Sequence, residues 1–325
     1  MTGEVQTAAE IVRARQLEAL RRNLGSQVLA WLEESAIVEV MLNPDGALWV
    51  ERLGSGMRQE GTMDAVRALA VVQSVAALRG AVVTAEAPIL ECELPLDGSR
   101  FEAILPPLVE RPVFTLRKKA LLVFTLENYV DAGILTAAQR EVIISAVRQR
   151  ANILVSGGTG SGKSTLLNAI LHAIGQETPE HRLVLLEDTR ELQWTMPNVV
   201  ALRTSDNIDM TRLLRATLRL RPDRIVVGEV RGAEALALLK AWNTGHPGGV
   251  GTVHANDAGA ALVRLGQLIQ EAGVPPQPEL IAEAAQWVVS IKRTKDAPGR
   301  RVDEIVRVVG YEKGRFVVEA MDAER

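Results

Sequence analysis

The chain has 325 residues, of which 47% are hydrophobic and 24% are charged, a composition that excludes a disordered or fibrous protein and suggests two globular domains. Its 37 Lys and Arg residues against 40 Asp and Glu give a formal net charge of −3, so any basic surface must be local and we expect no strong direct binding of nucleic acid. The single cysteine, Cys92, excludes an internal disulfide and a multi-cysteine zinc module, and it is typical of the reducing cytoplasm.

The N-terminal region predicts a helix and no membrane span. Apolar and charged residues alternate over Ala8–Leu24 as in an amphipathic helix, which packs in the fold, faces a partner or lies on a membrane surface. The longest charge-free apolar run lies between Arg67 and Arg79, which is shorter than the roughly 18–20 residues that a spanning helix needs. We expect a cytoplasmic protein, associated peripherally with the inner face of the cytoplasmic membrane through partners or through this surface helix.

The segment that follows predicts a small domain of mixed α and β structure. The turn residues Asn43–Gly46 separate two apolar runs and predict a β-hairpin. The expected elements are the strands Ile37–Leu42, Ala47–Arg52, Ser99–Leu105 and Val113–Leu116 and the helix Ala65–Gly80. We therefore expect an N-terminal α+β domain over residues 1–125.

A second domain is predicted over residues 126–325, with the linker placed in Arg117–Gly133. Thr136, followed three residues later by Gln139, forms a capping box at the start of a helix. From Asn152 onward, short apolar strands alternate with helices, which indicates a parallel sheet covered by helices, an α/β fold. The expected strands are Ile153–Val155, Leu183–Leu186, Ile225–Val227 and Val250–Val253, followed by a tail of strands over Trp287–Met321.

A glycine-rich segment lies between the first of these strands and a predicted helix. Residues Gly157–Thr165 match the pattern G-x-x-x-x-G-K-[ST], whose backbone N–H groups surround phosphate oxygens at a helix N-terminus. Lys163 is expected to reach the β- and γ-phosphates of ATP, and the hydroxyl of Ser164 to bind Mg²⁺. The candidate nucleotide ligands are Gly157, Gly158, Thr159, Gly160, Ser161, Gly162, Lys163, Ser164 and Thr165.

Carboxylates follow two of the predicted strands at the edge where the phosphate loop is expected. Glu187 and Asp188 come directly after one strand and are candidates for holding Mg²⁺ or water. Glu229 ends another strand and is a candidate for polarising the attacking water. Acids at strand ends also cap loops, and the sequence leaves open which of the three positions the water.

A histidine follows a third buried strand. His254 is a candidate sensor of the γ-phosphate, and an ordinary hydrogen-bonded loop histidine is the alternative. His172 and His181 are interpreted as structural.

Arginines are concentrated around residues 203–231. As nucleic-acid contacts they would need aromatic neighbours or a larger basic field, and neither is evident. As phosphate-facing or subunit-bridging groups they supply the positive charge that phosphoryl transfer needs, and a solvated helix face explains some of them. The candidates for catalysis are Arg215, Arg219 and Arg231.

Four boxes in this order resemble the traffic ATPases of bacterial type II and type IV secretion. They are the phosphate loop Gly157–Thr165, the acidic box Glu187–Leu192, the G-E-x-R segment Gly228–Arg231 and the histidine box Thr252–Asn256. The type II branch usually carries a four-cysteine module, and pilus-retraction relatives usually read Arg-Asp where this chain has Arg231-Gly232. The resemblance is therefore to the type IV branch and its conjugal-transfer ATPases.

The resemblance implies a RecA-like P-loop NTPase domain at the C-terminus and a homohexameric ring. It implies ATP held between the two domains, with Arg100 and Arg117 as candidate phosphate contacts. The implied activity is that of a Mg²⁺-dependent ATPase, a motor that energises type IV secretion or conjugal DNA transfer together with other proteins of the machinery. Gly228-Glu229 lacks the aspartate that often orders magnesium in P-loop enzymes, which leaves the division of labour among the acids open.

Two other functions are compatible with the same residues. A hexameric DNA helicase or translocase also uses a phosphate loop with arginines between subunits, but the acidic balance and few aromatics argue against it. A nucleotide-gated assembly scaffold would bind ATP and hardly hydrolyse it. A small-molecule kinase is disfavoured because no segment reads as a lid for an acceptor.

Overall fold

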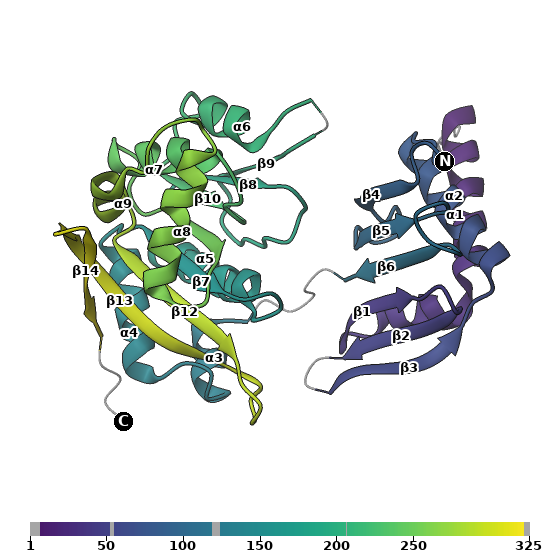
Figure 1. The fold of residues 1–325 in the computed structure, drawn as a ribbon, viewed down its shortest axis with the longest axis horizontal. Helices are drawn as coiled ribbons and strands as arrows, with labels where there is room; N and C mark the ends of the chain where they lie inside the picture. Colours follow the sequence, from purple (N-terminus) through teal and green to yellow (C-terminus); the bar gives the residue numbers. More distant parts are fainter. Residues whose placement is uncertain (1–6, 53–54, 119–123, 206, 322–325) are drawn as a thin grey trace, which may run out of the picture. The chain divides into compact units, whose positions relative to one another are not determined.

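The computed structural model describes residues 7–52, 55–118, 124–205 and 207–321. The chain divides into two compact units, Met1–Leu121 and Leu122–Arg325, each with its own sheet and hydrophobic core (Figure 1). Thr125 belongs to the second unit because its side chain caps helix α3 (Leu126–Asp131), whose Leu126 and Tyr129 are buried in that unit's core. Part of the segment expected as a linker is therefore helix.

The first unit is a six-stranded antiparallel sheet with two helices packed on it. The strand order is β3-β2-β1-β6-β5-β4, and α1 and α2 pack against each other (Figure 1). Its core contains side chains from both helices and from the inner strands. The elements are α1 (Ala8–Glu33), β1 (Ile37–Leu42), β2 (Ala47–Arg52), β3 (Gly56–Thr62), α2 (Ala65–Arg79), β4 (Ile89–Glu93), β5 (Arg100–Ile104) and β6 (Val113–Arg117).

The predicted hairpin is confirmed, whereas the first helix is longer than expected. Helix α1 continues past Leu24 to Glu33 through a kink at Gly25, where φ is 77°. The kink accommodates Arg67 of α2, whose Nε donates a hydrogen bond of 2.7 Å to the Asn23 carbonyl. Strand β3 was not expected, because it is an edge strand whose side chains are largely exposed and lack an apolar alternation.

The second unit contains an eight-stranded sheet in the order β14-β13-β12-β7-β11-β10-β8-β9. The strands from β12 to β9 pair in parallel, and β12, β13 and β14 pair antiparallel. The further elements are α4 (Ala137–Arg148), β7 (Ile153–Gly157), α5 (Lys163–Glu177), β8 (Leu183–Glu187), β9 (Val199–Arg203), α6 (Met210–Thr217), β10 (Arg224–Val227), α7 (Glu234–Asn243), β11 (Val250–His254), α8 (Ala258–Gln270), α9 (Pro278–Ala284), β12 (Trp287–Arg293), β13 (Arg300–Glu312) and β14 (Arg315–Ala320).

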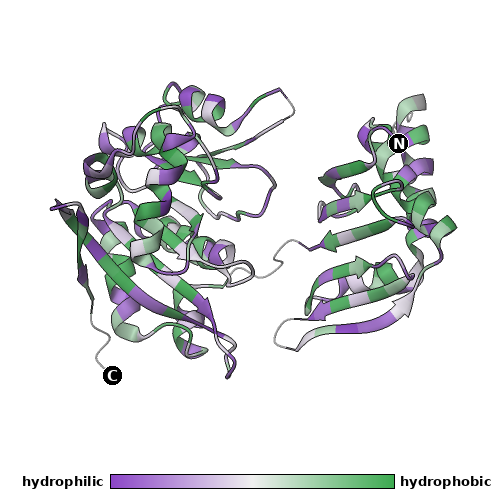
Figure 2. Ribbon diagram, viewed as in Figure 1, coloured by the Kyte–Doolittle hydropathy of each residue, from purple (hydrophilic) through white to green (hydrophobic). Residues whose placement is uncertain are grey.

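Helices cover both faces of this sheet, as the sequence predicted for parallel strands. One core cluster joins the sheet to α3, α4 and α5, and the other joins it to α6, α7, α8 and α9. Hydrophobic residues are accordingly concentrated on the central strands and on the helix faces against them (Figure 2). The capping box of Thr136 and Gln139 starts α4 as expected. None of the described helices combines the length and the apolar character that crossing a bilayer requires.

The parallel pairing determines where the candidate residues gather. Strands β7, β8, β10 and β11 are successive neighbours in space and run in the same direction, so their carboxyl ends share one edge of the sheet. The phosphate loop, the acidic box, the G-E-x-R segment and the histidine box each begin at one of these ends. The fold therefore brings four segments distant in sequence to one place.

Candidate functional site

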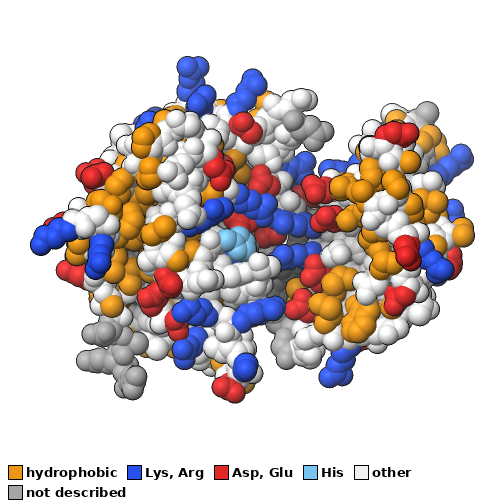
Figure 3. Space-filling model, in the orientation of Figure 1, with side chains coloured by type: hydrophobic (Ala, Val, Ile, Leu, Met, Phe, Trp, Pro, Cys, Tyr) orange, Lys and Arg blue, Asp and Glu red, His pale blue; other side chains and the backbone are white. Residues whose placement is uncertain are grey.

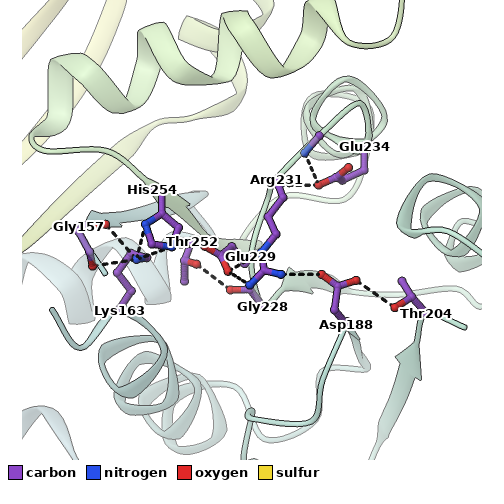
Figure 4. Close-up of polar contacts among 12 residues, drawn as sticks. Gly157, Lys163, Asp188, Thr204, Gly228, Glu229, Arg231, Glu234, Thr252 and His254 are labelled. Carbon is purple, nitrogen blue, oxygen red and sulfur yellow. Dashed lines mark hydrogen bonds and ion pairs between the residues drawn. The ribbon is translucent and has the colours of Figure 1, made fainter. Parts of the chain in front are cut away.

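The phosphate loop connects β7 to α5, and its lysine is nearly buried. Lys163 is 8% exposed, and its Nζ donates hydrogen bonds to the carbonyls of Gly157 at 2.9 Å and Gly158 at 3.1 Å. The same nitrogen lies 3.4 Å and 3.3 Å from Nδ1 and Nε2 of His254 (Figure 4). The loop thus holds the ammonium group of Lys163 beside His254 of the histidine box.

The loop backbone is packed too closely for side chains at some positions. A Cβ atom at Gly157 would lie 2.5 Å from the Ile291 carbonyl oxygen of β12 and 2.4 Å from Ser161 Oγ. Gly162, which precedes α5, has φ of 102°, a conformation that favours glycine. Ser164 and Thr165 begin the helix and are half-buried. The glycines that the motif requires are therefore required by this geometry as well.

A continuous set of polar contacts, here called the polar chain, joins the other three boxes. Glu229 Oε1 lies 2.7 Å from His254 Nε2, and Glu229 Oε2 accepts a hydrogen bond of 2.7 Å from Arg231 Nε. Arg231 Nη1 lies 3.6 Å from Asp188 Oδ2, and Asp188 Oδ1 accepts a hydrogen bond of 3.0 Å from the Thr204 hydroxyl. Figure 4 shows these side chains pointing toward one another. The polar chain reaches the phosphate loop through His254 and Lys163.

The backbone that carries Glu229 and Arg231 is held from both sides. The Thr252 hydroxyl of β11 donates a hydrogen bond of 2.8 Å to the Gly228 carbonyl. Glu234, in the first turn of α7, accepts hydrogen bonds from the backbone N–H groups of Arg231 at 2.6 Å and Gly232 at 2.9 Å. Because both anchors lie in regular elements, the segment presents its two side chains in a defined direction.

Arg231 is the central cation of the polar chain. Burial acts to lower its pKa, but the carboxylates of Glu229, Asp188 and Glu191 outweigh this effect and the pKa is raised. The guanidinium contacts Glu229 with two nitrogens, Nε at 2.7 Å and Nη2 at 2.5 Å. Arg231 thus stays charged and fixes one oxygen of Glu229, leaving the other toward His254.

Glu187 faces the backbone of its own loop. It is 4% exposed, and its Oε1 accepts hydrogen bonds from the N–H groups of Glu191 at 2.7 Å and Leu192 at 2.8 Å. Asn168 of α5 holds the same loop, because its amide donates to the Glu191 carbonyl and accepts from the Gln193 N–H. Glu187 and Asn168 therefore tie the acidic box to the helix that follows the phosphate loop. The only sequence signal for Asn168 was a polar residue within an apolar helical run.

The other candidate arginines belong to other elements of the two units. Arg215 is exposed on α6, and Arg219 is exposed just after it; neither takes part in the polar chain. Arg100 on β5 and Arg117 on β6 belong to the first unit, where they are register partners. Of the predicted arginines in the described part of the second unit, only Arg231 is brought to the other boxes.

Two arginines that the sequence did not single out lie beside the phosphate loop. Arg293, at the end of β12, donates a hydrogen bond of 3.0 Å from Nε to the Gly160 carbonyl. Arg300, at the start of β13, is its register partner, and its Nη1 would lie 2.8 Å from a Cβ atom at Gly162. No local pattern marks them, because they follow the loop by more than a hundred residues.

The interpretation of His181 as structural agrees with its contacts. Its Nδ1 accepts a hydrogen bond of 3.1 Å from Nε of Arg224, which is 1% exposed at the beginning of β10. The other guanidinium nitrogens of Arg224 donate to the carbonyls of Gly248 and Val147. Burial, with Arg224 nearby, lowers the pKa of His181. This cluster lies at the amino end of β10, away from the edge that carries the four boxes.

The residues present fit a nucleotide with Mg²⁺. Acidic and basic side chains gather around a histidine on the second unit's surface (Figure 3). Across the part of the chain that the structure describes, no group of three or more His, Cys, Asp or Glu residues is placed to hold a metal alone. Mg²⁺ at a phosphate loop usually keeps several waters and binds one or two protein oxygens plus phosphates. The hydroxyl of Ser164 and the half-exposed carboxylate of Asp188 fit that need better than Glu187, whose Oε1 is engaged by backbone.

Comparison with known proteins agrees with the four boxes. A family model described as "Type II/IV secretion system protein" matches residues 23–307. The chain is 51% identical over 306 residues to a probable conjugal transfer protein TrbB of Sinorhizobium fredii, covering 94% of each chain. It is 36% identical over 269 residues to a type IV secretion system protein PtlH homolog of Bordetella bronchiseptica, covering 72% of this chain and 77% of the relative.

A solved structure supports the fold. The X-ray structure of the Legionella pneumophila ATPase DotB matches with a TM-score of 0.60 at 18% identity, covering 96% of this chain and 84% of that one. At that identity the match shows the fold alone, and it confirms the predicted RecA-like α/β architecture. The family match and the sequence relatives show the family as well as the fold. The chain belongs to the type II/IV secretion system protein family, the traffic ATPases that its four boxes predicted.

Proposed function

We propose that this protein is an ATP-hydrolysing motor that energises conjugal DNA transfer or type IV secretion across the bacterial envelope. The observation that carries the proposal is the polar chain, because it joins the acidic, G-E-x-R and histidine boxes and ends at Lys163 in the phosphate loop. Phosphoryl transfer requires groups that orient the attacking water and stabilise the developing charge, and the polar chain supplies both kinds of group. The names of the relatives, a probable conjugal transfer protein and a type IV secretion system protein homolog, supply the transport process.

Glu229 is the residue that we assign to the attacking water. It is a carboxylate 17% exposed, with one oxygen beside His254 and the other held by Arg231. An ionised carboxylate accepts hydrogen bonds only, so it orients a water by its hydrogens and presents the water's lone pair to phosphorus. His254 lies between Glu229 and Lys163. We assign it to sensing the terminal phosphate, because a phosphate that moves either side chain also changes the contacts of His254.

The positive charge for phosphoryl transfer comes from two side chains of this unit. Lys163 exchanges the loop carbonyls for phosphate oxygens when nucleotide binds, because a charged acceptor forms the stronger hydrogen bond. Arg231 keeps Glu229 and Asp188 at fixed positions around the developing charge. Bound Mg²⁺, held by Ser164 and Asp188, would neutralise charge on the phosphates. Glu187 shapes the acidic box through backbone contacts.

The assembled form that we propose is a homohexameric ring. Arg215 and Arg219 are exposed cations on the α6 side of the second unit, available to a neighbouring subunit. We also propose Arg100 and Arg117 as phosphate contacts, on the basis of the family resemblance alone. Both residues belong to the first unit. An arginine supplied in trans to a transferring phosphoryl group raises turnover by large factors, so such contacts link hydrolysis to assembly.

We place the ring at the inner face of the cytoplasmic membrane, in contact with other proteins of the secretion machinery. The first turns of α1 support a peripheral contact, because Ile11 and Val12 are 40% and 54% exposed beside Arg13 and Arg15. Apolar side chains flanked by arginines suit either a partner surface or an anionic lipid headgroup layer. Removal of residues 8–16 is expected to shift the protein from the membrane fraction to the supernatant, and unchanged fractionation contradicts this placement.

The test of the proposed function is Mg²⁺-dependent ATP hydrolysis per subunit across a protein dilution series. Lys163→Ala is expected to reduce turnover to background, a loss of at least about a thousandfold, because phosphate binding and charge stabilisation are removed together. Lys240→Ala, which removes an exposed lysine from α7, serves as the matched control. Specific activity that falls on dilution supports sites completed between subunits. Wild-type protein that hydrolyses no faster than Lys163→Ala contradicts the motor.

A further inference from the structure

The hairpin formed by β12 and β13 runs directly past the phosphate loop. Strand β12 pairs in parallel with β7 up to Ser290 opposite Ser156, whose hydroxyl oxygens are 2.6 Å apart. Beyond this pair, the Ile291 carbonyl packs so closely on Gly157 that a Cβ atom there would lie 2.5 Å away. The end of the hairpin is therefore held at the same edge of the sheet as the loop.

Two arginines of this hairpin contact the loop itself. Arg293 Nε donates to the Gly160 carbonyl, and Arg293 Nη2 would lie 2.8 Å from a Cβ atom at Gly160. Arg300 Nη1 would lie 2.8 Å from a Cβ atom at Gly162. Gly160 and Gly162 both have positive φ and flank the buried Ser161. The two guanidinium groups thus lie against the part of the loop whose backbone surrounds phosphates.

The other cations of the hairpin are engaged elsewhere. Asp303 accepts a hydrogen bond of 2.6 Å from Lys292 Nζ and one of 2.9 Å from Arg301 Nη2. Lys292 lies opposite Arg301 in the hairpin register, as Arg293 lies opposite Arg300. Because successive side chains of a strand point to opposite faces, Lys292 and Arg301 contact Asp303, whereas Arg293 and Arg300 face the loop.

The position of the hairpin beside β7 determines which end of a bound nucleotide lies next to Arg293 and Arg300. Lys163 Nζ lies beside His254 of β11, so the terminal phosphate belongs on the β11 side of β7. Strand β12 is the neighbour of β7 on the opposite side. In a nucleoside triphosphate the γ-phosphate and the nucleoside are at opposite ends of one unbranched chain, so we expect the α-phosphate and nucleoside on the side of the hairpin.

We propose that Arg293 and Arg300 form a clamp for the α-phosphate and nucleoside end of the bound nucleotide, a proposal that rests on the proposed ATP site. A guanidinium suits both parts of that ligand, because it forms charge-assisted hydrogen bonds to phosphate and stacks on a purine ring. The clamp binds ATP and ADP alike and takes no part in cleaving the terminal phosphate. Its contribution is to nucleotide affinity.

The test measures the affinities of the full-length protein for ATP, ADP and inorganic pyrophosphate, which lacks both the α-phosphate and the nucleoside, by calorimetry. Arg293→Gln and Arg300→Gln are each expected to weaken ATP and ADP binding about tenfold, the value of one charge-assisted hydrogen bond, and pyrophosphate binding by less than about twofold. In steady-state hydrolysis, KM rises by the same factor while kcat is unchanged. Arg301→Gln, from the adjacent position that faces Asp303, is the matched control and keeps wild-type affinities.

The results separate this inference from the function on which it rests. Equal losses for pyrophosphate and ATP overturn the clamp, because the arginines then act on the β- and γ-phosphates. Unchanged affinities for all three ligands overturn it as well and leave the motor standing. Wild-type protein that binds neither ATP nor pyrophosphate overturns the proposed function itself. If a glutamine variant fails to fold, Arg293→Lys and Arg300→Lys retain the charge without the planar fork, and the same selective loss for ATP and ADP is expected in smaller measure.

Discussion

The two sides of the phosphate loop are built from different chemistry. On the β11 side, which we call the acidic flank, Asp188, Glu229, His254 and Arg231 neutralise one another in the polar chain. On the β12 side, the basic flank, Arg293 and Arg300 lie against the loop backbone. Charges of both signs in contact suit a step in which charge moves, whereas guanidinium groups beside the loop suit the binding of phosphate. We therefore propose that the acidic flank serves turnover and the basic flank serves nucleotide affinity.

The largest effect is expected on the acidic flank, from Glu229→Gln. The amide retains the size and one acceptor of the carboxylate but loses the charge that orients water and pairs with Arg231. We expect kcat to fall about 100- to 1,000-fold while ATP affinity changes by less than about threefold. Single-turnover hydrolysis and nucleotide titration measure the two quantities.

Glu312→Gln, an exposed change in β13, is the control for Glu229→Gln. A Glu229→Gln variant that keeps wild-type kcat removes Glu229 from the reaction. A variant that loses affinity instead of turnover breaks the division between the flanks.

A smaller effect on turnover is expected from Glu187→Gln, because Glu187 contacts the backbone of its own loop and does not belong to the acidic flank. The glutamine carbonyl can still accept from the Glu191 and Leu192 N–H groups, so we expect kcat to fall less than about tenfold. Glu187→Ala leaves those buried donors unpaired and is expected to cost about 1–3 kcal/mol of unfolding free energy, measured by urea titration. If Glu187→Gln is as inactive as Glu229→Gln, the charge of Glu187 matters and its role is catalytic as well as structural.

The smallest effect is expected at the opposite edge of the sheet, from His181→Gln. Burial lowers the folded-state pKa of His181 from its ordinary value of 6.5, so below that value the unfolded chain binds the proton first. The stability that neutral His181 provides is present above pH 6.5 and is lost as pH falls below it. His181→Gln keeps an acceptor for Arg224 and should give a shallower loss of stability between pH 7 and pH 5.

Thermal unfolding at each pH is the measurement for His181→Gln, with ATP hydrolysis at pH 7.5 as the second readout. Because His181 lies on neither flank, kcat and KM are expected to be unchanged. Altered turnover at pH 7.5 would connect this edge to the site and break the separation between structural and catalytic clusters.

The sequence by itself determined the local elements and the phosphate loop. The apolar runs before Gly157, Glu187 and Glu229 became buried parallel strands, and Thr136 with Gln139 became a capping box, because these signals act within a few residues. The order of the four boxes was sufficient to identify the family. Strands β3, β4 and β9 escaped prediction because they are edge strands with partly exposed side chains, and helix α3 escaped because it is shorter than two turns.

Only the tertiary structure decided what each side chain contacts. Glu187 and Glu229 end neighbouring strands in the same way, yet one caps its own loop and the other meets His254 and Arg231. Arg293 and Arg300 carry no motif and reach the loop because β12 pairs with β7 across more than a hundred residues of chain. The physical reason is that strand propensity is local, whereas the neighbour of a parallel strand is chosen by crossover connections and by the packing of the whole sheet.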